Sequence, residues 1–61
     1  MVTEIEFYQN IAADNGVTDV YNKNKHELMR EICIAKGLDS DEAYAKNWKE
    51  LLWWWAAHRA D

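Results

Sequence analysis

Three side chains that could together hold a soft metal ion fall on one face of a predicted helix. His26, Met29 and Cys33 are spaced at i, i+3 and i+7, which brings imidazole, thioether and thiol to the same side. The same spacing is typical of residues that border a hydrophobic core. With one cysteine and two histidines the chain cannot build a closed zinc site. We therefore expect no metal and no other cofactor, with Met29 and Cys33 at the margin of the core and His26 at its polar edge.

Catalytic residues do not form a recognisable arrangement in the sequence. Ser40 is the only serine and falls in a helix-starting turn, while His58 lies near the end of the last predicted helix. Cys33 has no basic group at a diagnostic spacing that would stabilise its thiolate. Glu27 and Glu31 lie one turn apart, but neither begins the Glu-x-x-His pattern of di-iron bundles. No glycine-rich phosphate loop is present, so we expect that the protein is not an enzyme.

A modest basic patch provides the main alternative function, that of a small nucleic-acid-binding regulator resembling helix-turn-helix domains. The chain has eleven acidic and seven basic residues and a formal net charge of −4, whereas a dedicated DNA reader usually has a strong basic excess. A solvated face whose charges pair with neighbouring acids explains the same residues. The candidate contacts for nucleic acid are Lys23, Lys25, Arg30 and Lys36.

Three consecutive tryptophans are the most informative feature of the sequence. On a helix, Trp53, Trp54 and Trp55 point in directions about 100° apart, so one core cannot receive all three. With Trp55 inward, Trp54 lies to one side and Trp53 points nearly away from the core. Tryptophan is enriched at binding hot spots, which favours a protein partner here. The predicted partner-binding residues are Trp53, Trp54, Lys46, Lys49, Glu50 and Ala57.

Two alternatives to a foreign partner stay open. The loop between the first two helices, or Met1 and Val2, could fold across Trp53 and cover it. The partner could also be a second copy of the chain, because contact about a two-fold axis is the commonest way to bury such a patch. A homodimer would also stabilise a domain of 61 residues that has no disulfide to support its small core.

Two glycines, Gly16 and Gly37, divide the chain into three predicted helices. The first covers about 4–14 and begins with a capping box in which Thr3 and Glu6 exchange hydrogen bonds. The second covers about 19–36 and is irregular near 22–24. Its start is open, because Thr18 could cap a helix from Asp19 and Asn24 with Glu27 forms a second capping-box pattern.

The third predicted helix covers about 40–59 and begins with the capping pattern of Asp39 and Glu42. Short connections and the lack of period-two alternation indicate an all-α fold, a small three-helix bundle with its neighbours antiparallel. The apolar stripe expected to face the core of this bundle consists of Tyr44, Trp48, Leu51 and Trp55.

The length and composition fit one helical domain over 1–61. The longest apolar run has seven residues, from Leu51 to Ala57, so a membrane span is not expected. The acidic start, with Glu4 and Glu6, is unlike a secretory signal or transit peptide. A single cysteine suits a reducing compartment, and we expect a cytoplasmic location.

In overall character the chain resembles the accessory proteins that tailed bacteriophages encode, which are short, proline-free, acidic and built of one domain. The resemblance covers the whole chain in length and composition and includes no specific motif. It implies a regulator that binds a host or phage protein in the host cytoplasm.

Overall fold

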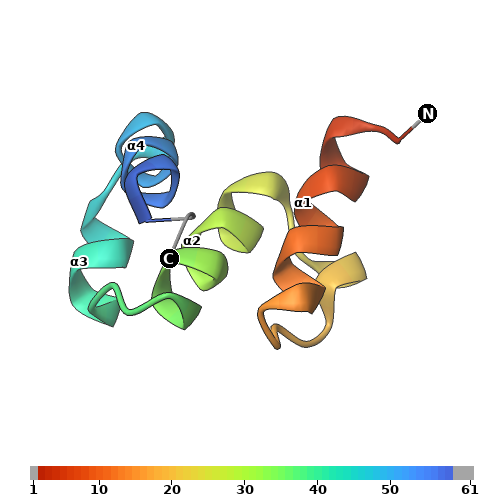
Figure 1. The fold of residues 1–61 in the computed structure, drawn as a ribbon, viewed down its shortest axis with the longest axis horizontal. Coiled ribbons are helices and arrows are strands. Elements are labelled where there is room, and N and C mark those ends of the chain that lie inside the picture. The colour runs from red at the N-terminus through yellow and green to blue at the C-terminus, as the bar shows by residue number, and fades with distance from the viewer. Residues whose placement is uncertain (1, 59–61) are drawn as a thin grey trace.

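The computed structural model describes residues 2–58, which fold into helices without any strand in that range (Figure 1). This confirms the all-α class and the small helical bundle. The bounds differ from the three predicted helices, because the second is shortened and the third is broken in two. The elements are α1 (Glu4–Asp14), the 3-10 turn η1 (Val20–Asn22), α2 (Lys25–Ala35), α3 (Ser40–Ala45) and α4 (Trp48–His58).

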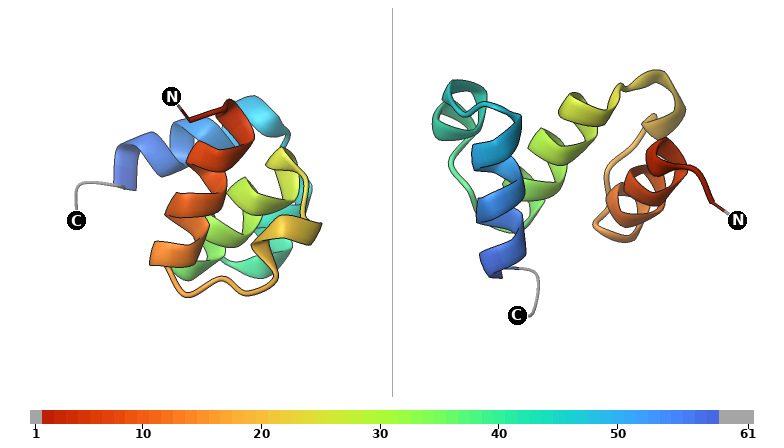
Figure 2. Two further views of the ribbon diagram at one scale, coloured as in Figure 1. Left: turned by 90° about the vertical axis from the view of Figure 1, so that its right-hand side faces the viewer. Right: turned by 90° about the horizontal axis from the view of Figure 1, so that it is seen from above.

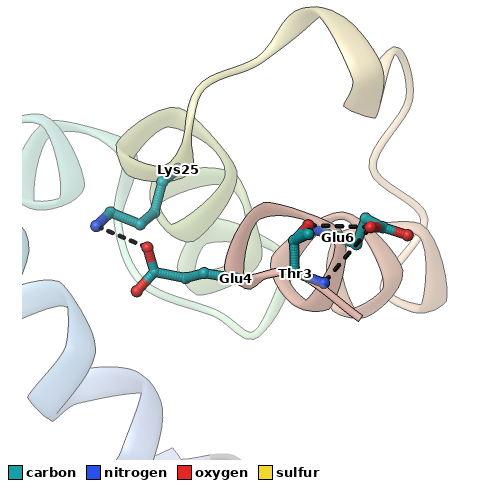
Figure 3. Close-up of polar contacts among 4 residues, drawn as sticks. All are labelled: Thr3, Glu4, Glu6 and Lys25. Carbon is teal, nitrogen blue, oxygen red and sulfur yellow. Dashed lines mark hydrogen bonds and ion pairs between the residues drawn. The ribbon is translucent and has the colours of Figure 1, made fainter. Parts of the chain in front are cut away.

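Helix α1 has the bounds that its capping signals predict. The hydroxyl of Thr3 accepts a hydrogen bond from the backbone N–H of Glu6, and the Glu6 carboxylate accepts one from the N–H of Thr3 (Figure 3). Gly16 ends the helix with a φ of +83°, a conformation that glycine adopts without strain. The N–H of Val17 then reaches back to the carbonyl of Ala12, which is the bond of a Schellman motif.

The prediction of one helix over 19–36 is wrong in its first part, because α2 begins at Lys25. Asn24 caps it by accepting a hydrogen bond from the N–H of Glu27 at 2.8 Å, and the Glu27 carboxylate accepts one from the N–H of Asn24. The helix cannot extend upstream, because Lys23 and Asn24 are extended, with ψ of 142° and 174°. Asp19, where the predicted helix began, is itself left-handed with φ of +58°. The residues that follow Asp19 form η1, which buries Val20 and leaves Tyr21 84% exposed.

The single helix predicted over 40–59 is wrong as well. Lys46 is extended with ψ of 143°, and Asn47 caps a new helix by accepting from the N–H of Glu50 at 2.9 Å. The Glu50 carboxylate accepts from the N–H of Asn47 at 3.0 Å, which completes another capping box. The break turns Tyr44 away from the expected stripe and leaves it 62% exposed. Arg59, the predicted last residue, lies outside the described residues.

The core has two parts that meet at Tyr8 and Trp55. One gathers Met29, Cys33, Leu38, Ala43 and Leu51 between α2, α3 and α4, and the other gathers Ala12, Val20, Leu28 and Ile32 between α1, η1 and α2. Helix α2 therefore lies in the middle and packs against the other three α-helices. Two views show α4 running across the direction of α1 rather than antiparallel to it (Figure 2).

None of the helices in the described range is both long and apolar enough to cross a lipid bilayer.

Candidate functional site

The three consecutive tryptophans of α4 have three different environments. Trp55 is half-buried and packs against both parts of the core. Trp54 is half-buried at the side, where its ring stacks on His58 with the ring centroids 3.8 Å apart. Trp53 is 72% exposed. The indole predicted to point away from the core does so.

Trp53 lies at the centre of an exposed surface that we call the outer face of α4. Its members are one helical turn before and one turn after Trp53, at positions i−4, i−3, i+3 and i+4, so they share one side of the helix. All of them are exposed. The outer face consists of Lys49, Glu50, Trp53, Ala56 and Ala57.

Three of the other predicted partner-binding residues, Lys49, Glu50 and Ala57, therefore lie beside Trp53. The remaining two do not. Trp54 is held against the core and His58, and Lys46 is half-buried in the connection before α4. Ala56 belongs to the outer face but was not predicted, although its place three residues after Trp53 is the signal that would have identified it.

The alternative in which the chain covers Trp53 does not describe this structure. An exposed fraction of 72% leaves no room for a covering loop over the indole. Val2 is itself 56% exposed. The segment between α1 and α2 packs elsewhere, with Val17 and Val20 against the core near α1. Met1, the other predicted cover, lies outside the described residues.

The four basic residues of the alternative function do not form one open surface. The Lys25 ammonium lies 3.2 Å from the Glu4 carboxylate (Figure 3). It also lies 4.8 Å from the centre of the Trp48 ring. The Arg30 guanidinium lies over the Tyr44 ring at 4.4 Å. Since Lys25 and Arg30 are five residues apart on a helix, they point in directions about 140° apart.

The other two candidate nucleic-acid contacts lie apart from this pair. Lys23 donates a hydrogen bond to the carbonyl of Thr18 at 3.0 Å, within the segment that leads to α2. Lys36 caps the opposite end of α2 and is half-buried. The structure therefore distributes the four cations over both ends and two sides of α2.

The candidate chemistry of Cys33 is suppressed by its position. Cys33 and Met29 have no exposed surface and lie inside the core, deeper than the margin predicted for them. Burial raises the pKa of the Cys33 thiol from its ordinary value of 9.0 to about 11, although the positive charge of Lys46 acts in the opposite direction. The thiol is therefore neutral near pH 7 and is a poor nucleophile.

The other candidates for metal binding and catalysis are also dispersed. His26 is half-buried in the first turn of α2, where its ring packs edge-on against Trp48. Across residues 2–58, no three side chains of His, Cys, Asp or Glu come together as metal ligands would. An open depression of about 230 Å³ lies where the α1–η1 connection meets α2, below the roughly 300 Å³ typical of ligand pockets. Lys23 and Glu31 are among the residues that line it.

Comparison with known proteins finds no relative: no family model, curated protein or solved structure matches the chain.

Proposed function

We propose that this protein is a small non-enzymatic interaction module, and that it modulates a protein partner by binding it through the outer face of α4. The observation that carries the proposal is the 72% exposure of Trp53 at the centre of that face. Ala56 and Ala57, one turn after Trp53, are small and exposed, so they leave that side of the indole open to an approaching surface. Trp53 is therefore the anchor, with Lys49 and Glu50 as its polar border.

The energy available from this one side chain supports a role in binding. A tryptophan buries up to ~250 Å², so an indole that is 72% exposed leaves roughly 180 Å² for a partner to cover. At ~25 cal/mol per Å² this burial contributes about 4 kcal/mol to association. Contributions of that size are found at interface hot spots, where tryptophan is the most enriched residue type.

We expect the stability of the fold not to depend on this exposed indole. Leu51, on the opposite side of α4, has no exposed surface, and Trp55 packs against both parts of the core. These residues account for how α4 is held in place. Trp53 is available for a partner because the helix is already fixed by its other side.

Site-specific photocrosslinking in the cell that naturally makes the protein tests the proposal. The photoreactive residue p-benzoylphenylalanine replaces Trp53 in one variant and Tyr21 in a matched control, since Tyr21 is 84% exposed and lies on η1. We expect illumination to give one covalent adduct of defined mass from position 53 and none of that mass from position 21.

A second substitution makes the result specific for the outer face. Ala57→Arg places a bulky charge beside position 53 and should remove the adduct. The proposal is overturned if position 53 gives no adduct, if both positions give the same products, or if Ala57→Arg leaves the adduct unchanged. The mass of the adduct also reports whether the partner is a second copy of the chain or a different protein.

A further inference from the structure

We infer that the partner is a second copy of this chain, and that the two α4 helices pack antiparallel across a two-fold axis that passes beside Trp53. This inference rests on the proposed function, because it identifies the occupant of the outer face of α4. It is argued from the order of large and small side chains along that face, from the charges at its two ends and from its area.

The outer face has long side chains at one end and small side chains at the other. Lys49 and Glu50 precede Trp53 by one turn, and Ala56 and Ala57 follow it by one turn. In an antiparallel pair whose two-fold axis passes beside Trp53, Lys49 of one copy lies opposite Ala57 of the other. Glu50 then lies opposite Ala56. Each long side chain then meets an alanine of the other copy, and the two indoles pack side by side at the axis.

A parallel pair would fit less well. It would place Lys49 against its own counterpart and Ala57 against its own counterpart, so that like charges meet at one end and a gap remains at the other. A cavity of that kind and a facing pair of equal charges are both unfavourable. The sequence of the outer face therefore selects the antiparallel direction.

In the same arrangement no two equal charges face each other. Lys49 and Glu50 carry opposite charges at neighbouring positions, so this end of the outer face is neutral overall. In the antiparallel pair it lies beside the uncharged Ala56 and Ala57 of the other copy. The contact repeats on both sides of the axis, because a two-fold interface presents each pair of residues twice.

The area of the outer face predicts a weak, reversible dimer. Two exposed indoles with the adjoining alanines and aliphatic stems offer on the order of 600 Å² in total, about half of the smallest standard-size interface. We therefore expect a dissociation constant on the order of 100 μM, so that monomer and dimer exchange and both are present at high concentration.

Sedimentation equilibrium on the purified chain tests the dimer. The average mass should rise from 7.2 kDa toward twice that value as the concentration increases from about 10 μM to about 1 mM. Trp53→Ala should weaken association at least tenfold, whereas Tyr21→Ala, at an even more exposed aromatic residue on η1, should leave it unchanged. Far-UV circular dichroism should give the same helix content for all three proteins.

A charge-exchange pair tests the direction and the register. Ala57→Lys should weaken the dimer several-fold, because the new ammonium faces Lys49 of the other copy. Adding Lys49→Glu to Ala57→Lys should restore association, since each new lysine then faces a new glutamate. Within one copy these two positions are eight residues apart, so they are too distant for the restoration to come from contacts inside one helix.

Two results overturn this inference. One is a mass that stays at 7.2 kDa up to about 1 mM, and the other is a dimer that Trp53→Ala does not weaken or that the charge exchange does not restore. The proposed function fails separately, by the photocrosslinking test. A strict monomer that still gives a heavier, foreign adduct from position 53 would remove the self-pairing and retain the interaction module.

Discussion

Leu51 and Trp53 are two residues apart on α4, and their side chains face opposite environments. Leu51 has no exposed surface, whereas Trp53 is 72% exposed. We expect Leu51→Ala to lower the free energy of unfolding by about 2–5 kcal/mol, because it removes a buried isobutyl group and leaves a cavity. Trp53→Ala should change it by less than about 0.5 kcal/mol. Urea unfolding of dilute protein, followed by circular dichroism, measures both values.

An effect of Trp53→Ala as large as that of Leu51→Ala would show that the indole belongs to the fold. The measurement is made at low concentration so that self-association does not contribute. If Trp53 had a structural role of that kind, loss of association in Trp53→Ala would no longer identify the outer face of α4 as a binding site.

Cys33 gives the protein a pH dependence whose sign can be stated in advance. Burial raises the pKa of its thiol to about 11 in the folded state, while an unfolded chain has a value near 9.0. Between these two values the unfolded state loses its proton first, so the free energy of unfolding falls as the pH rises. A difference of two pKa units corresponds to about 3 kcal/mol, fully present below pH 9 and lost by about pH 11.

The control for this prediction is Cys33→Ala, which removes the titrating thiol from the core. The two proteins share every other ionisable group, so the test is the difference between them and not the pH profile of either one. We expect the stability gap between wild type and Cys33→Ala to narrow between pH 9 and about pH 11. A gap that stays constant with pH would contradict a raised pKa at this position.

At the scale of the elements, Asn47 decides where α4 begins. Its side chain accepts from the N–H of Glu50, and its own N–H donates to the Glu50 carboxylate. Although alanine is the better helix former, Asn47→Ala should lower the free energy of unfolding by about 1 kcal/mol, because the first turn of α4 loses its cap. Thermal or urea unfolding measures the change.

The matched control is Asn10→Ala, at an exposed asparagine inside α1. There the same substitution should be neutral or slightly stabilising, because asparagine is a weaker helix former than alanine in a helix interior. Equal effects at both positions would mean that the cap of Asn47 contributes little.

The helix starts show how far local signals could predict this fold. Capping patterns at Thr3 and Asp39 predict the first residues of α1 and α3, and the pattern at Asn24 predicts the start of α2. Each of these signals depends on hydrogen bonds between residues that are two or three positions apart. Both partners of each hydrogen bond are therefore present in a short stretch of sequence, and the capping signal can be recognised without the tertiary structure.

The two errors arose where hydrophobic periodicity continued across a break. Tyr44 and Trp48 are one helical turn apart and belong to the predicted stripe, yet the cap at Asn47 begins a new helix between them. Tyr44 is then placed against the guanidinium of Arg30 instead of the core. Hydrophobic periodicity assigns residues to one face only while the helix is continuous. The capping pattern of Asn47 and Glu50 was the signal that the helix is interrupted before Trp48.

The position of Trp53 could be predicted because it depends on α4 alone. Three consecutive residues on a helix always point in different directions, and the buried side of α4 contains Leu51. The basic patch could not be judged in the same way. Whether Lys25 faces water or a neighbour depends on where α1 and α4 place Glu4 and Trp48, which is a property of the tertiary structure.

At the scale of the whole molecule, two of the basic side chains are used to connect helices. Lys25 of α2 contacts Glu4 of α1 and the Trp48 ring of α4, and Arg30 of α2 lies over Tyr44 of α3. Each contact of this kind contributes about 0.5–1 kcal/mol at an exposed site. These cations help α2 to hold the surrounding helices, and they are less available to an external polyanion.

The net charge of −4 then makes salt a test that separates self-association from nucleic-acid binding. Two copies with centres about 20 Å apart, each with this net charge, repel by roughly 3 kcal/mol in water without salt. Salt near 0.15 M shortens the screening length to ~8 Å and removes most of this repulsion. Sedimentation equilibrium should therefore show tighter self-association as salt rises from about 0.02 M to about 0.15 M.

Binding to nucleic acid has the opposite dependence, because each neutralised phosphate releases counterions and the affinity falls steeply with salt. We expect no retarded band in a mobility-shift assay with duplex DNA or RNA even at about 0.02 M salt, where such binding is strongest. A retarded band that weakens with salt and disappears in Lys23→Ala and Lys36→Ala would favour the nucleic-acid alternative. Lys23 and Lys36 are the informative positions, because within residues 2–58 neither contacts an aromatic ring or a carboxylate. Lys25 and Arg30 make such contacts, so their substitution would also affect the fold.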